Sequence, residues 1–334
     1  MSEGEQTDSL AAVVLAAGLS KRMKSRTIKV LHPLCGKPAV LHLLASLQEA
    51  GFRRVILVVG HQREEVERVV GSRAEYVVQE ELLGTGDAVR RAVPVLPPEG
   101  TVLVTYGDTV LYRAETFRQL VAFHLQTGAS ATLLSAELVD PTGYGRIVRD
   151  ENGAFRKIVE ERDALPAEKA IREINTGTYC FHVPDLVAAL AEISPGNAQG
   201  EYYLTDTLGW LSARGRRVEV LPLADPEEAL GFNDRVQLAL AERVLRDRIR
   251  RRWMAAGVTL VDPAAIYIDP EVEIGPDTII EPGSWLVGKT HVGAGCHLGP
   301  WVYLEDARIA DGSRLAFCRC LGEGPAEALI EKVR

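Results

Sequence analysis

The spacing of apolar residues divides the chain into segments with different predicted architectures. Three short aliphatic runs, each ending in glycine or a polar turn, occur early in the sequence: AAVVLAAG, RRVILVVG and TVLVTYGD. Between them, residues 39–50 and 62–70 have the apolar spacing of helices. Buried strands that alternate with helices predict an α/β domain, with a mostly parallel sheet covered on both faces. Such sheets bind ligands at the carboxyl ends of their strands.

A second type of apolar spacing begins near residue 234. Four apolar positions recur every three to five residues, which predicts a long helix over residues 234–254: Val236, Leu240, Val244 or Leu245, and Ile249. We therefore expect a polar tail over residues 1–9, an α/β domain over 10–232 and a linker helix over 233–257. A different domain should occupy residues 258–334.

The last segment consists of six-residue units. They read VEIGPD, TIIEPG, SWLVGK, THVGAG, CHLGPW, VYLEDA and RIADGS. The aliphatic residues at the third position are Ile274, Ile280, Leu286, Val292, Leu298 and Leu304. This repeat is typical of a left-handed parallel β-helix, in which one aliphatic side chain per face stacks into the core. Because so few coils bury little surface, we expect capping or association, with a homotrimer as the candidate assembly. Residues 326–334 are expected to form a closing helix.

Composition narrows the range of functions. The chain has 334 residues and a formal net charge of −8, which argues against a general nucleic-acid-binding surface. The sequence contains no apolar run long enough to span a membrane. Five scattered cysteines argue against a disulfide framework and predict reduced thiols in the cytoplasm.

The end of the first predicted strand has features of a phosphate site. Small residues at a strand end let the backbone approach a ligand closely, and their N–H groups can hold phosphate. This segment comprises Leu15, Ala16, Ala17 and Gly18. Arg22 and Lys29 follow it and could neutralise a triphosphate. A packing turn without a ligand is the alternative.

Two later segments add candidate ligand-binding groups. Gln79 precedes a glycine turn at Gly84 and Thr85, and its amide could hydrogen-bond a nucleobase edge. Asp108 directly follows the third apolar run, where a carboxylate can ligate Mg²⁺. A helix N-cap is the alternative role for this aspartate.

Motifs spread over most of the α/β domain resemble one known family. In order they are LAAG, RM, KVLH, QEELLGTGDA, YGD, PTGYGRIV, IVEERDA, EINTG, NAQGEYYLTD and GFND. Together they resemble the uridylyltransferase half of bacterial bifunctional UDP-N-acetylglucosamine pyrophosphorylase/glucosamine-1-phosphate N-acetyltransferases. That family carries a β-helix after its nucleotidyltransferase domain, as this sequence does. The resemblance implies a Rossmann-like nucleotidyltransferase domain over residues 10–232, followed by a shortened left-handed β-helix.

The resemblance also implies roles for individual residues. The nucleotide would contact Leu15, Ala16, Ala17, Gly18, Lys29, Gln79, Gly84 and Thr85. Arg22, Lys29 and Asp108 would be catalytic, and Asp108 with Asn233 would hold Mg²⁺. The sugar phosphate would contact Tyr106, Gly145, Glu160, Asn175 and Tyr202. From the residues alone, Glu160 could equally lie on a solvated face, Asn175 in a turn, and Asn233 at a helix cap.

The implied reaction transfers a uridylyl group from UTP to N-acetylglucosamine-1-phosphate and releases pyrophosphate. A different sugar phosphate (glucose-1-phosphate with UTP or dTTP) and a non-catalytic sugar-nucleotide-binding protein are the alternatives. Departures from the family pattern at Ser20, Lys21, Ile28 and Val110 affect loop geometry and remove no needed charge. No counterpart of the family's acetyltransferase motifs occurs, and His291 and His297 fit ordinary repeat positions. We therefore expect no acetyl transfer.

Overall fold

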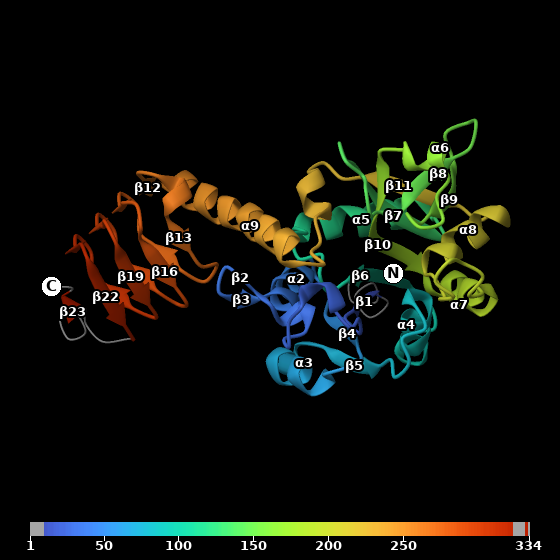
Figure 1. Cartoon of the computed structure of the whole chain (residues 1–334), viewed down its shortest axis with the longest axis horizontal. Helices are drawn as coiled ribbons and strands as arrows, with labels where there is room; N and C mark the ends of the chain where they lie inside the picture. The colour runs from blue at the N-terminus through green and yellow to red at the C-terminus, as the bar shows by residue number, and fades with distance from the viewer. Residues whose placement is uncertain (1–9, 323–330, 333–334) are drawn as a thin grey trace. The chain divides into compact units, whose positions relative to one another are not determined.

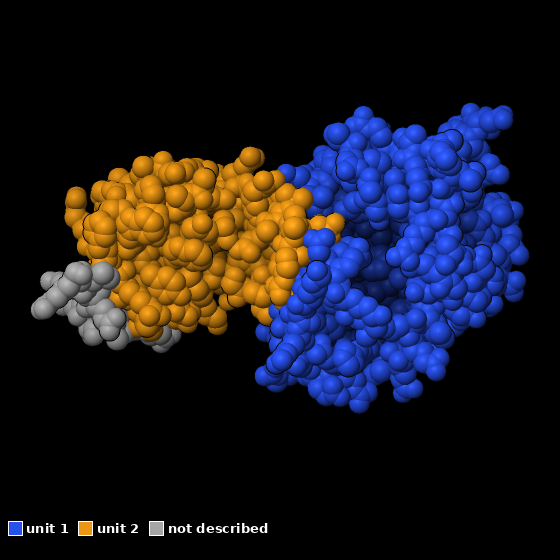
Figure 2. All heavy atoms as spheres, viewed as in Figure 1, with its two compact units in different colours: residues 1–31, 39–234 blue, residues 32–38, 235–334 orange. Residues whose placement is uncertain are grey.

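The computed structural model describes residues 10–322 and 331–332. The chain divides into two compact units, which are coloured separately in Figure 2. Unit 1 comprises residues 1–31 and 39–234, and unit 2 comprises residues 32–38 and 235–334. The expected tail over residues 1–9 lies outside the described residues. Among the described residues, no helix has the length and apolar character needed to cross a membrane.

Unit 1 is built on a nine-stranded sheet in which seven strands follow the order β11-β7-β10-β6-β1-β4-β5 (Figure 1). β8 and β9 pair with each other, and β8 also pairs with β10. The strands are β1 Leu10–Leu15, β4 Arg54–Val59, β5 Glu75–Val78, β6 Thr101–Tyr106, β7 Ala131–Glu137, β8 Arg146–Arg149, β9 Phe155–Val159, β10 Glu173–His182 and β11 Val218–Pro222. β10 runs antiparallel to β6 and β7, whereas β1 pairs in parallel with β4 and β6. The prediction of a mixed, mostly parallel sheet is confirmed.

Helices pack against this sheet. They are α2 Ala39–Glu49, α3 Arg63–Val70, α4 Thr85–Ala92, α5 Ala114–Thr127, α6 Pro166–Lys169, α7 Val183–Glu192 and α8 Thr205–Ala213. Val13, Ile56 and Val104 on neighbouring strands are fully buried, which explains why these segments read as continuous apolar runs. The helices expected over residues 39–50 and 62–70 are confirmed.

The pairing register places two distant segments at one edge of the sheet. Leu15, the last residue of β1, pairs with both Val58 and Tyr106. The Gly107 N–H then donates to the Leu15 carbonyl at 2.9 Å. The turns after β1 and β6, which carry Gly18 and Asp108, therefore lie at the same carboxyl edge, as the strand pattern predicts.

In unit 2 a long helix, α9 Arg235–Ala255, precedes the repeats. Its bounds are close to those of the helix predicted over residues 234–254. A short hairpin of β2 Pro33–Leu34 and β3 Lys37–Pro38 also belongs to this unit. Three parallel sheets follow, and their strands are β12 Thr259–Leu260, β15 Ile279–Ile280, β18 His297–Leu298 and β21 Arg314–Leu315; β13 Tyr267–Ile268, β16 Trp285–Val287, β19 Val302–Glu305 and β22 Cys318–Leu321; and β14 Glu273–Ile274, β17 His291–Val292 and β20 Arg308–Ile309.

The repeat pattern corresponds to the coils of a β-helix. Tyr267 pairs with Trp285, and Trp285 with Tyr303, so each strand stacks on the equivalent strand of the next coil. The six predicted third-position aliphatic side chains, Ile274 to Leu304, are all buried in the core of this unit. The closing helix expected over residues 326–334 lies outside the described residues, except that Glu331–Lys332 forms strand β23, antiparallel to β22. All five cysteines are buried and free.

Candidate active site

A cavity of about 310 Å³ opens at the carboxyl edge of the sheet in unit 1. Figure 2 shows that this unit is hollowed on the face turned toward the viewer. The cavity is lined by most of the residues proposed from the sequence: Leu15, Ala16, Ala17, Gly18, Lys29, Gln79, Gly84, Thr85, Tyr106 and Asp108. These residues come from four separate segments of the chain, between residues 15 and 108.

The loop after β1 offers unused backbone donors to this cavity. The Ala16 N–H is committed to the Val58 carbonyl at 2.9 Å. Within the described part of the chain, by contrast, the N–H groups of Ala17, Gly18 and Leu19 donate to no protein acceptor. Successive free N–H groups in a turn form a concave site for anions. The loop can therefore hold phosphate oxygens without a charged side chain of its own.

Lys29 lies at the centre of the charged end of the cavity. Its ammonium forms an ion pair with Oδ2 of Asp108 and donates to Oδ1 of Asn233 at 3.0 Å. The Lys29 N–H donates to the Ser20 hydroxyl at 3.1 Å, which ties the lysine to the loop after β1. The Lys29 and Asp108 side chains are 19% and 13% exposed. An ion pair this sheltered is screened less by solvent than a surface pair.

The same oxygens fit a divalent cation. Asp108 and Asn233 direct a carboxylate oxygen and an amide oxygen at one positive centre, the Lys29 ammonium. Mg²⁺ uses one or two protein oxygens of this kind and completes its shell with phosphate and water. No cluster of three or more His, Cys, Asp or Glu side chains that could hold a metal occurs in the residues described. A magnesium site here would thus depend on substrate oxygens.

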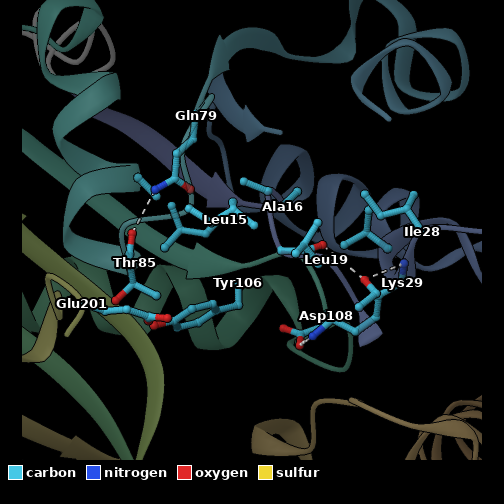
Figure 3. A pocket seen from close by; sticks show the side chains of 17 residues that line it. Leu15, Ala16, Leu19, Ile28, Lys29, Gln79, Thr85, Tyr106, Asp108 and Glu201 are labelled. Carbon is cyan, nitrogen blue, oxygen red and sulfur yellow. Dashed lines mark hydrogen bonds and ion pairs between the residues drawn. The ribbon is translucent and has the colours of Figure 1, made fainter. Parts of the chain in front are cut away.

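The opposite end of the cavity carries the amide of Gln79. Figure 3 shows Gln79 and Thr85 at one end and Lys29 with Asp108 at the other, with Leu15 and Ala16 between them. The Gln79 side chain is buried, and its Nε2 donates to the Gly84 carbonyl at 3.0 Å. Gly84 has a φ of +112°, and a Cβ there would lie 2.5 Å from the Tyr202 carbonyl oxygen. Only glycine fits at this turn.

Three of the proposed sugar-binding residues form a cluster that does not line this cavity. The Asn175 N–H donates to the Gly145 carbonyl at 2.8 Å, and a Cβ on Gly145 would lie 3.3 Å from Oε2 of Glu160. Burial raises the pKa of Glu160, although the Thr205 hydroxyl donates to its carboxylate at 3.2 Å. The pKa of Tyr106, which does line the cavity, is raised by burial and then by the charge of Glu160.

Glu160 also borders a second cavity, of about 560 Å³, together with Asp206 and Trp210. The Asn175 side chain is engaged within the protein, since its Nδ2 donates to the Tyr179 hydroxyl at 2.7 Å. Its Oδ1 accepts the Gly177 N–H at 3.1 Å.

Two further proposed residues have side chains outside the cavity lining. Arg22 is exposed on a short 3₁₀ turn, Lys21–Met23. The Tyr202 ring lies under the Arg90 guanidinium, 4.8 Å from its carbon, while its backbone N–H donates to the Leu83 carbonyl at 2.7 Å. Glu201, which sequence reasoning did not single out, lines the cavity instead. Its only sequence signal is its place in the NAQGEYYLTD motif.

Comparisons with known proteins agree with the fold of unit 1. The family model of the MobA-like NTP transferase domain matches residues 12–196. A solved structure from Bacillus anthracis, described as a glucose-1-phosphate thymidylyltransferase in complex with a sucrose, superposes with a TM-score of 0.61. It covers 71% of this chain and 96% of its own, at 21% identity, and so supports the fold alone. The fold and the matched family model together define a nucleotidyltransferase.

Curated relatives narrow the class to one family. The bifunctional protein GlmU of Caldanaerobacter subterraneus subsp. tengcongensis is 49% identical over 310 residues, which cover 93% of this chain and 68% of the relative. GlmU proteins of Halalkalibacterium halodurans and Heliobacterium modesticaldum are 47% and 50% identical, each over 90% of this chain and 66% of the relative. The chain belongs to the GlmU family. It spans about two thirds of the length of these relatives.

Proposed function

We propose that the chain transfers a uridylyl group from UTP to N-acetylglucosamine-1-phosphate, giving UDP-N-acetylglucosamine and pyrophosphate in the presence of Mg²⁺. The observation that carries this proposal is the division of one cavity into two ends. Gln79 offers an amide at one end, and Lys29 with Asp108 offers charge at the other. A nucleoside triphosphate has the same two ends, a polar planar base and a chain of anionic phosphates.

The reaction needs no general base. The sugar phosphate is already an anion at neutral pH, so one of its oxygens can attack the α-phosphorus of UTP in line. A new P–O bond forms, and the bond between the α-phosphorus and the α,β-bridging oxygen breaks. Pyrophosphate leaves with that oxygen and with the electron pair of the broken bond. The protein therefore contributes positioning and charge compensation, as in phosphoryl transfer generally.

Lys29 supplies the mobile positive charge. Its flexible side chain starts paired with Asp108 and can turn toward phosphate oxygens, while the N–H groups of Gly18 and Leu19 hold them. A Mg²⁺ ion held by Asp108 and Asn233 would act as a Lewis acid and add to the charge compensation. Arg22 would contribute from the adjoining exposed turn once phosphate draws its side chain inward.

The proposed sugar site lies next to Tyr106. Glu160, Gly145 and Asn175 form one connected cluster there, with Glu160 close enough to raise the pKa of the Tyr106 hydroxyl. A buried carboxylate can accept hydrogen bonds from sugar hydroxyls, and a sugar that lacks them would leave it unpaired. Tyr202 would contribute its backbone, which shapes the Gly84 turn.

The remaining proposals concern assembly and compartment. We propose that unit 2 associates as a homotrimer and that the enzyme acts on its two small-molecule substrates in the cytoplasm, without nucleic-acid or membrane partners. Exposed Trp301 and Phe317 on successive coils support association, and the five free cysteines support a reducing compartment. Sedimentation equilibrium should give three times the chain mass; a monomer at micromolar concentration would contradict the trimer.

Pyrophosphate release tests the reaction directly. Wild-type protein would be incubated with Mg²⁺, each of UTP and dTTP, and each of N-acetylglucosamine-1-phosphate and glucose-1-phosphate. We expect the highest kcat/KM for UTP with N-acetylglucosamine-1-phosphate. Asp108→Asn should abolish measurable release, and Glu64→Gln, which changes an exposed carboxylate on α3, should leave it unchanged. A preference for glucose-1-phosphate would overturn the sugar assignment, and tight binding without turnover would overturn catalysis.

A further inference from the structure

We propose that Asp87 fixes the orientation of the Gln79 amide and thereby makes the cavity select uracil over cytosine. Asp87 would be a positioning residue, because it contacts Gln79 and does not line the cavity. The inference rests on the proposed function for the identity of the nucleotide, and it assigns the choice of base to a residue in the first turn of α4.

The hydrogen bonds of Gln79 define which way its amide faces. Its backbone N–H donates to the Val59 carbonyl at 2.8 Å, which anchors the residue directly after β5. One end of its side-chain amide lies 3.0 Å from the Gly84 carbonyl oxygen and 2.9 Å from Oδ2 of Asp87. Both partners are acceptors, so this end must be the NH₂ group. The reverse orientation would place Oε1 against two oxygens, one of them charged.

This orientation of the Gln79 amide determines which of its atoms faces the cavity. Both N–H bonds of Gln79 are directed at protein acceptors, so Oε1 is the polar atom that remains for a ligand. Figure 3 shows the amide nitrogen of Gln79 directed away from Leu15 and the oxygen on the opposite side, nearer Leu15 in the cavity lining. A base edge that meets Oε1 must therefore donate a hydrogen bond.

This requirement distinguishes the two pyrimidines. Uracil presents a donor, N3–H, in the middle of its pairing edge, whereas cytosine presents a lone pair at the same atom. Cytosine in the same pose would place two lone pairs against each other and leave a buried acceptor unpaired, which costs binding free energy. Thymine has the same edge as uracil, so the inference predicts acceptance of both.

Asp87 holds the amide more firmly than Gly84 can alone. Gln79 and Asp87 are both 3% exposed, and a hydrogen bond to a carboxylate is stronger than one to a neutral carbonyl. Arg91, one helical turn later, pairs with Oδ1 of Asp87 at 3.3 Å and keeps the carboxylate in place. The alternative role, a carboxylate that stabilises the positive end of α4, would not depend on the base.

Binding measurements with UTP and CTP separate these roles. Dissociation constants would be measured by calorimetry for wild type, Asp87→Ala, Asp87→Asn and Glu81→Ala, an exposed acid in the same loop. We expect wild type to prefer UTP by on the order of 100-fold, because CTP would leave the buried Oε1 of Gln79 without a donor. Asp87→Ala should reduce that preference about tenfold or more, mainly through weaker UTP binding. Asp87→Asn should restore most of it, because its carbonyl oxygen still accepts from Gln79, and Glu81→Ala should match wild type.

Two results would overturn the inference. One is an unchanged preference in Asp87→Ala, whatever happens to its overall affinity. The other is a wild type that binds UTP and CTP equally, which needs no variant to fold. The turnover assay keeps the two proposals apart: selective UTP binding without pyrophosphate release contradicts the proposed function alone, and equal turnover of UTP and CTP contradicts this inference alone. In active protein, the effect of Asp87→Ala should fall on the KM for UTP, with kcat changed little.

Discussion

The two units differ in how their important contacts are distributed along the sequence. In unit 1 the decisive contacts join Lys29, Asp108 and Asn233, which occupy widely separated positions in the chain. In unit 2 the decisive contacts join equivalent residues of successive coils, such as Leu286 and Leu304. The first arrangement concentrates function in a few aperiodic side chains, and the second distributes stability over many periodic ones. A substitution among these contacts should therefore affect activity in unit 1 and stability in unit 2.

The largest contrast should come from the same substitution made in each unit. Lys29→Ala should lower kcat/KM by on the order of 10³-fold, because the site loses the charge that compensates the phosphates. Lys289→Ala, which removes a lysine from a turn of unit 2, should change kcat/KM less than twofold. Pyrophosphate release at saturating Mg²⁺ measures both. Equal losses in the two variants would show that activity depends on the units jointly.

Core truncation in unit 2 should give the next largest effect. Leu286→Ala removes a fully buried side chain from the β-helix and should lower the free energy of unfolding of this unit by about 3 kcal/mol. Ile279→Ala, on the outer face where the side chain is 36% exposed, should cost well under half as much. The kcat/KM of both variants should equal that of wild type.

Tryptophan fluorescence can follow unit 2 alone. Trp210 belongs to unit 1 and Trp253, Trp285 and Trp301 to unit 2, so a Trp210→Phe background isolates the second unit. Urea titrations in that background would then measure how much Leu286→Ala and Ile279→Ala each lower the free energy of unfolding of unit 2. A parallel fall in turnover would contradict the separation of roles.

Acid should act on unit 1 through a buried histidine. Burial lowers the pKa of His124 from 6.5 to about 4, and its Nδ1 lies 2.9 Å from the Thr132 hydroxyl. Below pH 6.5 this histidine binds a proton in the unfolded chain, whereas in the folded chain it stays neutral until about pH 4. The free energy of unfolding therefore falls between pH 6.5 and pH 4. The loss should reach about 2 kcal/mol at pH 5. His124→Gln should flatten this part of the curve, and an unchanged slope in urea titrations at several pH values would contradict it.

The smallest effect should come from the aromatic stack on the surface of the β-helix. The Tyr267 and Trp285 rings are 3.9 Å apart and nearly parallel. Trp285→Leu should lower the stability of unit 2 by about 1 kcal/mol through loss of that stack. Trp301→Leu, a more exposed tryptophan at a coil corner, provides the matched control with a smaller effect. Equal losses in the two variants would show that the stack does not determine the cost.

The periodic parts of the molecule were predictable from the sequence, and so were the residues at strand ends. The third-position aliphatics of unit 2 repeat at a fixed interval, and Asp108 follows an apolar run that can only be a buried strand. The partners of Gln79 were not predictable, because Gly84 and Asp87 approach it through the geometry of one turn. The hairpin at residues 33–38 likewise gives no signal that it belongs with α9, since that association depends on tertiary packing.

The engagement of Lys29 by Asp108 and Asn233 also has a consequence for how substrate enters. A largely buried carboxylate without a counter-ion would be unfavourable, and the lysine provides that counter-ion before any nucleotide arrives. A divalent ion that arrived by itself would have to displace an ammonium from both oxygens. An ion that arrives already chelated by the triphosphate brings the anionic oxygens to which the ammonium can transfer. Under the proposed function, nucleotide and metal should therefore enter this site as one complex.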